Sequence, residues 1–138
     1  MTPQLHFNPK RVYELDAIAW ELNRDTPYVP SPLLYGDTIY FIKTNSGILT
    51  CLNAATGESH YGPQRLEGIS NIYASPVGAG NRIYLTGREG TTLVIRNDPR
   101  FEVLAQNSLD DGFDASPAIV GNELYLRGRK YLYCIAPD

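Results

Sequence analysis

The chain has 138 residues, of which 43% are hydrophobic and 20% are charged. This length fits one domain, and the composition supports a packed core and excludes a wholly disordered chain. Twelve Lys and Arg residues against fifteen Asp and Glu residues give a net charge of −3, which argues against nucleic acid as a partner. No stretch approaches the roughly 20 apolar residues that span a bilayer, so no membrane span is predicted.

The N-terminal residues Met1–Lys10 hold no apolar run of the kind that marks a signal peptide. The sequence alone therefore does not assign the protein to a cellular compartment.

Three segments of the chain repeat one pattern of eleven residues. They begin at Ser31, Ser75 and Ser116 and read SPLLYGDTIYF, SPVGAGNRIYL and SPAIVGNELYL. The segments start 44 and 41 residues apart, and a regular period of this length indicates a repeat architecture.

Each copy predicts short strands joined by tight turns. Ser-Pro opens a first strand, where the missing N–H of proline does little harm. A Gly-Asp or Gly-Asn pair then supplies the positive φ that a two-residue hairpin requires. The second strand is apolar on both faces, so both faces of its sheet should be covered. One tyrosine of this strand is predicted to be buried in every copy, namely Tyr40, Tyr84 and Tyr125.

A third strand follows in each copy, beginning near Ile48, Thr92 and Tyr131. Fourth strands are predicted to end at Leu66 in the first copy and Leu109 in the second, whereas the third copy has no fourth strand of its own. We predict that Val12–Leu22 supplies this fourth strand, although Leu15, Ile18, Ala19 and Leu22 also have helical spacing. The expected organisation is one propeller unit over 1–138, with a closing strand at 12–24 and blades at 28–70, 71–112 and 113–138.

The repeat, followed by G-I-L-T-C-L-N-A-A-T-G-E from Gly47, resembles the pyrroloquinoline-quinone-like β-propeller repeat. This repeat occurs in quinoprotein alcohol dehydrogenases and in outer-membrane assembly lipoproteins of Gram-negative bacteria. The resemblance implies an all-β propeller fold and a bacterial, exported or periplasmic parent. In that family the turn after the third strand reads A-x-D-x-x-T-G-K-x-x-W, and its Trp docks on the next blade. Here Asn53, Glu58 and Tyr61 stand where the family has Asp, Lys and Trp.

Three blades are too few to close a ring, because each would have to fill about 120°. An open arc would leave an apolar blade face bare at each end. We therefore expect a homodimer in which two chains form a six-bladed ring.

Residues just before the inner strands are candidates for binding a protein or peptide partner. They are Arg24, Tyr28, Tyr73, Asp110, Asp111, Phe113 and Asp114. The favoured alternative is that the aromatic residues fill the gaps between blades. The acidic loop lacks the residue order of a calcium loop, so a solvated turn is favoured there.

No catalytic, metal or cofactor site is predicted. Cys51 and Cys134 occupy equivalent places on different blades, too far apart for a disulfide, and are interpreted as buried small side chains. His6 and His60 lack the spacing of zinc ligands. The adjacent Cys-Cys pair that quinoprotein alcohol dehydrogenases carry is absent.

The sequence therefore favours a non-enzymatic propeller module for binding or scaffolding. One alternative is a fragment of a quinoprotein-like dehydrogenase whose catalytic blades are absent. Another is an engineered or evolved unit for propeller closure.

Overall fold

The computed structural model describes residues 18–137, which form eleven strands in three antiparallel sheets. No helix in this range is long and apolar enough to cross a membrane. The strands are β1 (Leu33–Tyr35), β2 (Thr38–Ile42), β3 (Ile48–Asn53), β4 (Ser59–Arg65), β5 (Val77–Ala79), β6 (Arg82–Thr86), β7 (Thr91–Arg96), β8 (Val103–Ser108), β9 (Ala118–Val120), β10 (Glu123–Arg127) and β11 (Leu132–Ile135).

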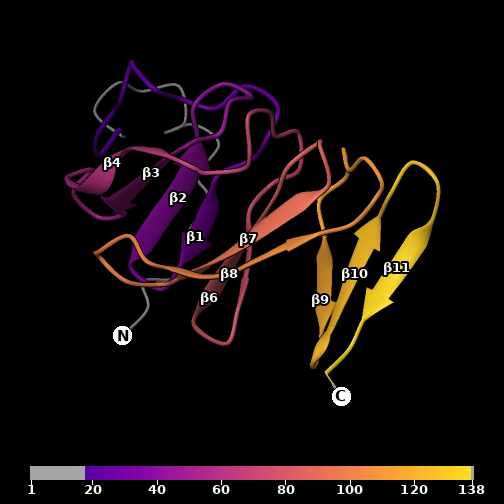
Figure 1. Cartoon of the computed structure of the whole chain (residues 1–138). Coiled ribbons are helices and arrows are strands. Elements are labelled where there is room, and N and C mark those ends of the chain that lie inside the picture. The colour runs from indigo at the N-terminus through magenta and orange to yellow at the C-terminus, as the bar shows by residue number, and fades with distance from the viewer. Residues whose placement is uncertain (1–17, 138) are drawn as a thin grey trace, which may run out of the picture.

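The three sheets are the blades of a β-propeller. Blade 1 has the strand order β1-β2-β3-β4, blade 2 the order β5-β6-β7-β8, and blade 3 the order β9-β10-β11. The first strand of blade 2 lies beside the first strands of blades 1 and 3. The sheets follow one another along the chain as Figure 1 shows, from indigo through orange to yellow.

The predicted hairpins form where each first strand meets the second. Gly80 and Asn81 both have positive φ, +59° and +62°, between the paired residues Ala79 and Arg82. Gly36 and Gly121 take the same conformation in the other two blades. Glycine has no Cβ to oppose positive φ, which explains the repeat of this residue.

The largest core cluster lies between blades 1 and 2. Blade 1 contributes the cross-strand pairs Tyr40–Cys51 and Ile42–Leu49, all fully buried. Blade 2 faces them with two further buried pairs, Ile83–Ile95 and Leu85–Leu93. The loop between the two blades adds Leu66, Ile69 and Ile72 to the cluster. Burial of each Ile or Leu side chain in this cluster stabilises the fold by roughly 1.5–3 kcal/mol.

The three repeat tyrosines are not equally buried, which corrects the expectation from the sequence. Tyr40 is fully buried and its hydroxyl donates a hydrogen bond to Asn97 Oδ1 at 2.7 Å. Tyr84 and Tyr125 are only half-buried. The reason is that blade 2 packs tightly on blade 1 alone, while the outer face of blade 3 meets no further blade in residues 18–137.

The closing strand predicted over 12–24 does not form in its described part. Residues 18–24 contain no strand, and residues 12–17 lie outside the described range. Trp20 instead contacts blade 1, where its ring covers Gly57 and its indole N–H donates to Ala54 O at 2.9 Å. Tyr61, on β4 of blade 1, packs in a related way toward blade 2, and its ring centroid lies 5.6 Å from that of Phe101.

The two cysteines have equivalent positions and different environments. Cys51 pairs with Tyr40, and Cys134 pairs with Tyr125. Cys51 is buried, and burial raises the pKa of its thiol to about 11. Cys134 is exposed on the outer face of blade 3, so the prediction of two buried cysteines holds for one of them.

We expect the alanine substitutions of Tyr40 and Tyr84 to differ in cost. Tyr40→Ala should lower the free energy of unfolding by about 3–5 kcal/mol, because a buried ring leaves a cavity. Tyr84→Ala should cost clearly less, because that ring is half-exposed. Chemical denaturation of the two variants checks this, and equal losses would contradict the difference in packing.

The thiols should also react at different rates. With Ellman's reagent near neutral pH, Cys134 should react quickly, whereas Cys51 should react only after denaturation, since burial and a raised pKa both suppress its thiolate. Cys134→Ser should abolish the fast phase. Two equally fast thiols would show that blade 1 opens readily.

Candidate interaction surface

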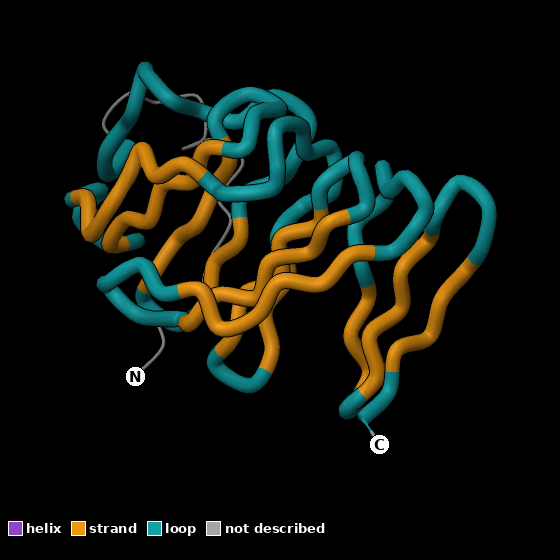
Figure 2. The backbone as a smooth tube through the Cα atoms, in the orientation of Figure 1, coloured by secondary structure: helices purple, strands orange, loops and turns teal. Residues whose placement is uncertain are grey.

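The loops at one edge of the blades form a continuous belt. Backbone hydrogen bonds join each loop to the next, from Thr44 N–H to Thr26 O at 2.7 Å through to Arg129 N–H to Gly112 O at 2.9 Å. The intermediate links run from Ile72 to Asn45, Arg88 to Asn71 and Phe113 to Arg88. Figure 2 shows these loops in teal along the upper edge. The structure thus gathers all the loops that carry the predicted partner-binding residues.

The serines of the repeat link neighbouring blades. The backbone N–H of Ser31 donates to Ser75 Oγ at 2.9 Å, and that of Ser75 donates to Ser116 Oγ at the same distance. We call this chain of hydrogen bonds the serine relay. Within residues 18–137 it has two open ends, the Oγ of Ser31 and the N–H of Ser116.

Four side chains form a charged and aromatic cluster on the belt. Arg88 lies over the ring of Tyr73, with 3.9 Å from its guanidinium carbon to the ring centroid. The same Arg88 donates to Asp114 Oδ1 at 2.6 Å, and Arg129 lies 3.4 Å from Asp114 Oδ2. The hydrogen bond from Arg88 lowers the pKa of Asp114 despite partial desolvation. Arginine stacked on an aromatic ring is a common element of protein interfaces.

Two predicted partner-binding residues point inward. Phe113 is fully buried and packs 5.8 Å from the ring of Tyr133. Asp111 is buried and accepts hydrogen bonds from Gly112 N–H, the N–H groups of Lys130 and Tyr131, and the Tyr133 hydroxyl. These two residues hold the turn between β10 and β11 and do not reach the surface.

The remaining predicted residues lie on the surface of the belt. Arg24, Tyr28 and Asp110 are exposed, and Tyr28 is 80% accessible. The loop before β1 is held by the Asp25–Lys43 ion pair at 3.0 Å. The predicted set therefore divides into an exposed group and a buried pair.

The sequence analysis did not select Arg88 and Arg129. Both occupy the turn between the second and third strands of their blades. This shared position in the repeat is the sequence feature that could have identified them as neighbours on the belt. Glu89, from the same turn as Arg88, accepts hydrogen bonds from the backbone and hydroxyl of Ser70.

Within the described residues, no group of three His, Cys, Asp or Glu side chains could hold a metal ion. His60 is exposed on β4, and His6 lies outside the described range.

Known structures share this fold at low sequence identity. BamB from Moraxella catarrhalis matches with 12% identity and a TM-score of 0.53, over 76% of this chain and 41% of that one. A europium-containing methanol dehydrogenase matches with 13% identity and a TM-score of 0.53, over 70% of this chain and 20% of that one. The chain thus spans less than half the length of either, and the likeness shows the β-propeller fold alone. No family model and no curated protein matches the sequence.

Acid should loosen blade 3 before the other blades. Burial opposes ionisation of Asp111, yet the hydrogen bonds it accepts lower its pKa, as those of Asp114 do. A lowered folded-state pKa gives stability that is present above the unfolded value near 4 and is lost as the pH falls through the folded value. Hydrogen exchange should therefore show early loss of protection in residues 128–133.

Two variants check the cause of this acid response. Asp111→Asn should reduce protection of the same segment already at neutral pH, whereas Asp110→Asn, an exposed neighbour, should not. Equal behaviour of the two variants would contradict a structural role for Asp111.

Proposed function

We propose that this chain is a non-enzymatic β-propeller scaffold module that completes a six-bladed ring with a second copy of itself. The observation that supports this most directly is the serine relay. Its open Ser116 N–H at one end of the arc complements the open Ser31 Oγ at the other, so a head-to-tail contact between two chains continues the same hydrogen-bond pattern.

The outer face of blade 3 supports the same proposal. The alternation of β9, β10 and β11 places Val120, Tyr125, Leu132 and Cys134 on one face. Val120 and Leu132 are 64% and 68% exposed. At the other end of the arc, Leu34 of blade 1 is also exposed, whereas Phe41 and Leu52 of the same face are buried. Glu123 and Arg127 lie on the same face of blade 3, opposite Val120 and Leu132. Exposed apolar side chains on a blade face favour contact with another protein surface.

The belt of loops is the surface that such a ring would offer to a further polypeptide. It carries side chains of both charges and several aromatic rings, among them Tyr28, Tyr73, Arg88, Asp114 and Arg129. BamB, one of the structural neighbours, is a propeller of the same type.

Solution mass tests the ring. Light scattering at tens of micromolar should give about twice the monomer mass of 15.4 kDa. Leu132→Glu should return the protein to a folded monomer, because it places a charge in the proposed contact. Leu104→Glu on β8 is the matched control and should leave the dimer intact. A monomeric wild type, or equal effects of both variants, would overturn the proposal.

The relay itself can be tested by removing its open acceptor. Ser31→Ala should weaken dimerisation roughly 30-fold, because the ring has two such contacts and loses two hydrogen bonds of about 1 kcal/mol each, and it should leave monomer stability unchanged. Ser75→Ala should instead lower the stability of the chain, since its hydroxyl joins two blades of the same molecule.

A cofactor titration separates this proposal from the dehydrogenase-fragment alternative. Pyrroloquinoline quinone with calcium should show no saturable change in absorption on adding the protein. A saturable change would favour the enzyme fragment.

A further inference from the structure

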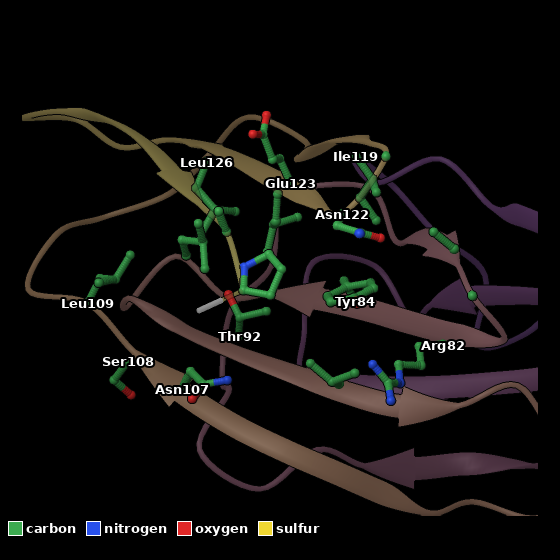
Figure 3. Close-up of a pocket in the computed structure, with 18 of the residues that line it drawn as sticks. Arg82, Tyr84, Thr92, Asn107, Ser108, Leu109, Ile119, Asn122, Glu123 and Leu126 are labelled. Carbon is green, nitrogen blue, oxygen red and sulfur yellow. The ribbon is translucent and has the colours of Figure 1, made fainter.

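A cavity of about 870 Å³ separates blades 2 and 3. Its walls are β6 and β7 on one side and β10 with the end of β11 on the other, as Figure 3 shows. Ligand sites in proteins commonly measure about 300–1,000 Å³. The equivalent space between blades 1 and 2 is filled by the main core cluster, so the cavity is specific to one of the two blade interfaces.

Small side chains on blade 2 create this space. On blade 1 the face toward the next blade carries the pair Ile42–Leu49. The register of β6 and β7 places Thr86 and Thr92 at the same positions of blade 2. Their hydroxyls pair with each other at 3.1 Å, which satisfies them without filling the gap. Blade 2 thus replaces two large apolar side chains with two threonines whose polar groups are already bonded.

A large side chain is also replaced by a small one on the fourth strand of blade 2. Tyr61 of β4 lies opposite Cys51 and packs toward blade 2, whereas Ala105 lies opposite Val94 at the equivalent position of β8. A tyrosine ring is therefore missing from the second interface.

On the first strands, the large and the small residue change sides between the two blade interfaces. The ring of Tyr35 occupies the place where Gly78 would carry a Cβ. At the next interface Ala79 takes the place of Tyr35, and Ile119 takes the place of Gly78. Both Ala79 and Ile119 line the cavity, so it extends to the inner end of the gap between blades 2 and 3. The unfilled volume reaches from these first strands to the fourth strand of blade 2, where Asn107 and Ser108 line it.

The cavity has an apolar wall and one cation. Leu124, Leu126 and Ile135 line it from blade 3. Arg82 lines it from blade 2, and no carboxylate within residues 18–137 forms an ion pair with it. Glu123 belongs to the same lining, but Figure 3 shows its carboxylate on the side of β10 away from the cavity, and it accepts a hydrogen bond from Tyr125 at 2.6 Å.

We propose that the cavity between blades 2 and 3 binds a compact aromatic anion, with its rings against Val94, Leu124 and Leu126 and its acidic group on Arg82. Tyr84, two residues from Arg82 on β6, lines the same cavity. This site is independent of the proposed ring, because it lies between blades 2 and 3 and not at the outer faces of blades 1 and 3 where the ring would close.

The test uses 1-anilinonaphthalene-8-sulfonate, which has aromatic rings and one fixed negative charge. Its fluorescence should saturate at one molecule per chain. Arg82→Met should weaken binding by about tenfold, the loss expected for a charge-assisted hydrogen bond. Arg65→Met, which removes an equal charge from β4 of blade 1, should leave the affinity unchanged.

Two further measurements separate the roles of charge and volume. N-phenyl-1-naphthylamine, which has the same rings without the sulfonate, should bind more weakly and with equal affinity to wild type and Arg82→Met. Thr92→Leu, which copies Leu49 of blade 1, should weaken binding of both probes to a similar extent while the chain remains folded in a denaturation assay.

Amide chemical shifts locate the bound probe. Those of 107–109 and 122–126 should change on titration, and those of blade 1 should not. Binding that does not saturate, that is equal in all variants, or that shifts the amides of blade 1 would overturn the proposal.

Discussion

A sheet whose second and third strands are apolar on both faces needs a neighbour on each side, and this requirement organises the molecule. Blades 1 and 2 satisfy it for each other, with Tyr40 and Leu49 on one side and Ile83 and Leu93 on the other. The close packing of these side chains holds the two sheets at a defined separation. The hairpin turns, the loop belt and the serine relay depend on this arrangement because they connect residues that it brings together.

Burial decreases along the arc for the same reason. The residues of β2 and β3 that face blade 2 are fully enclosed, those of β6 and β7 that face blade 3 line a cavity, and β11 is largely exposed. Blades 1 and 2 therefore form the most closely packed part of the molecule. The cavity and the exposed face of blade 3 are the places where the chain has surface available for binding.

Charge and burial are divided between the two sides of the belt. Asp111 faces inward and ties the turn between β10 and β11 to its own loop, whereas Asp114 faces outward between Arg88 and Arg129. Two carboxylates three residues apart thus have different tasks. A buried carboxylate with several N–H and O–H donors stabilises a loop, while an exposed one between two guanidinium groups shapes the surface that a partner would meet.

The sequence by itself determined the all-β class, the three repeats, the glycine turns and the strand order, because these follow from local spacing and backbone conformation. It also indicated which loops would gather, since equal offsets in a repeat become neighbouring positions in space. Only the tertiary structure decided the depth of burial. Tyr40 and Tyr84, or Cys51 and Cys134, share an offset in the repeat and differ in their neighbours. Likewise, Thr86 and Thr92 are ordinary strand residues in the sequence, and only the structure shows that they stand where blade 1 has Ile42 and Leu49 and that Thr92 lines a cavity.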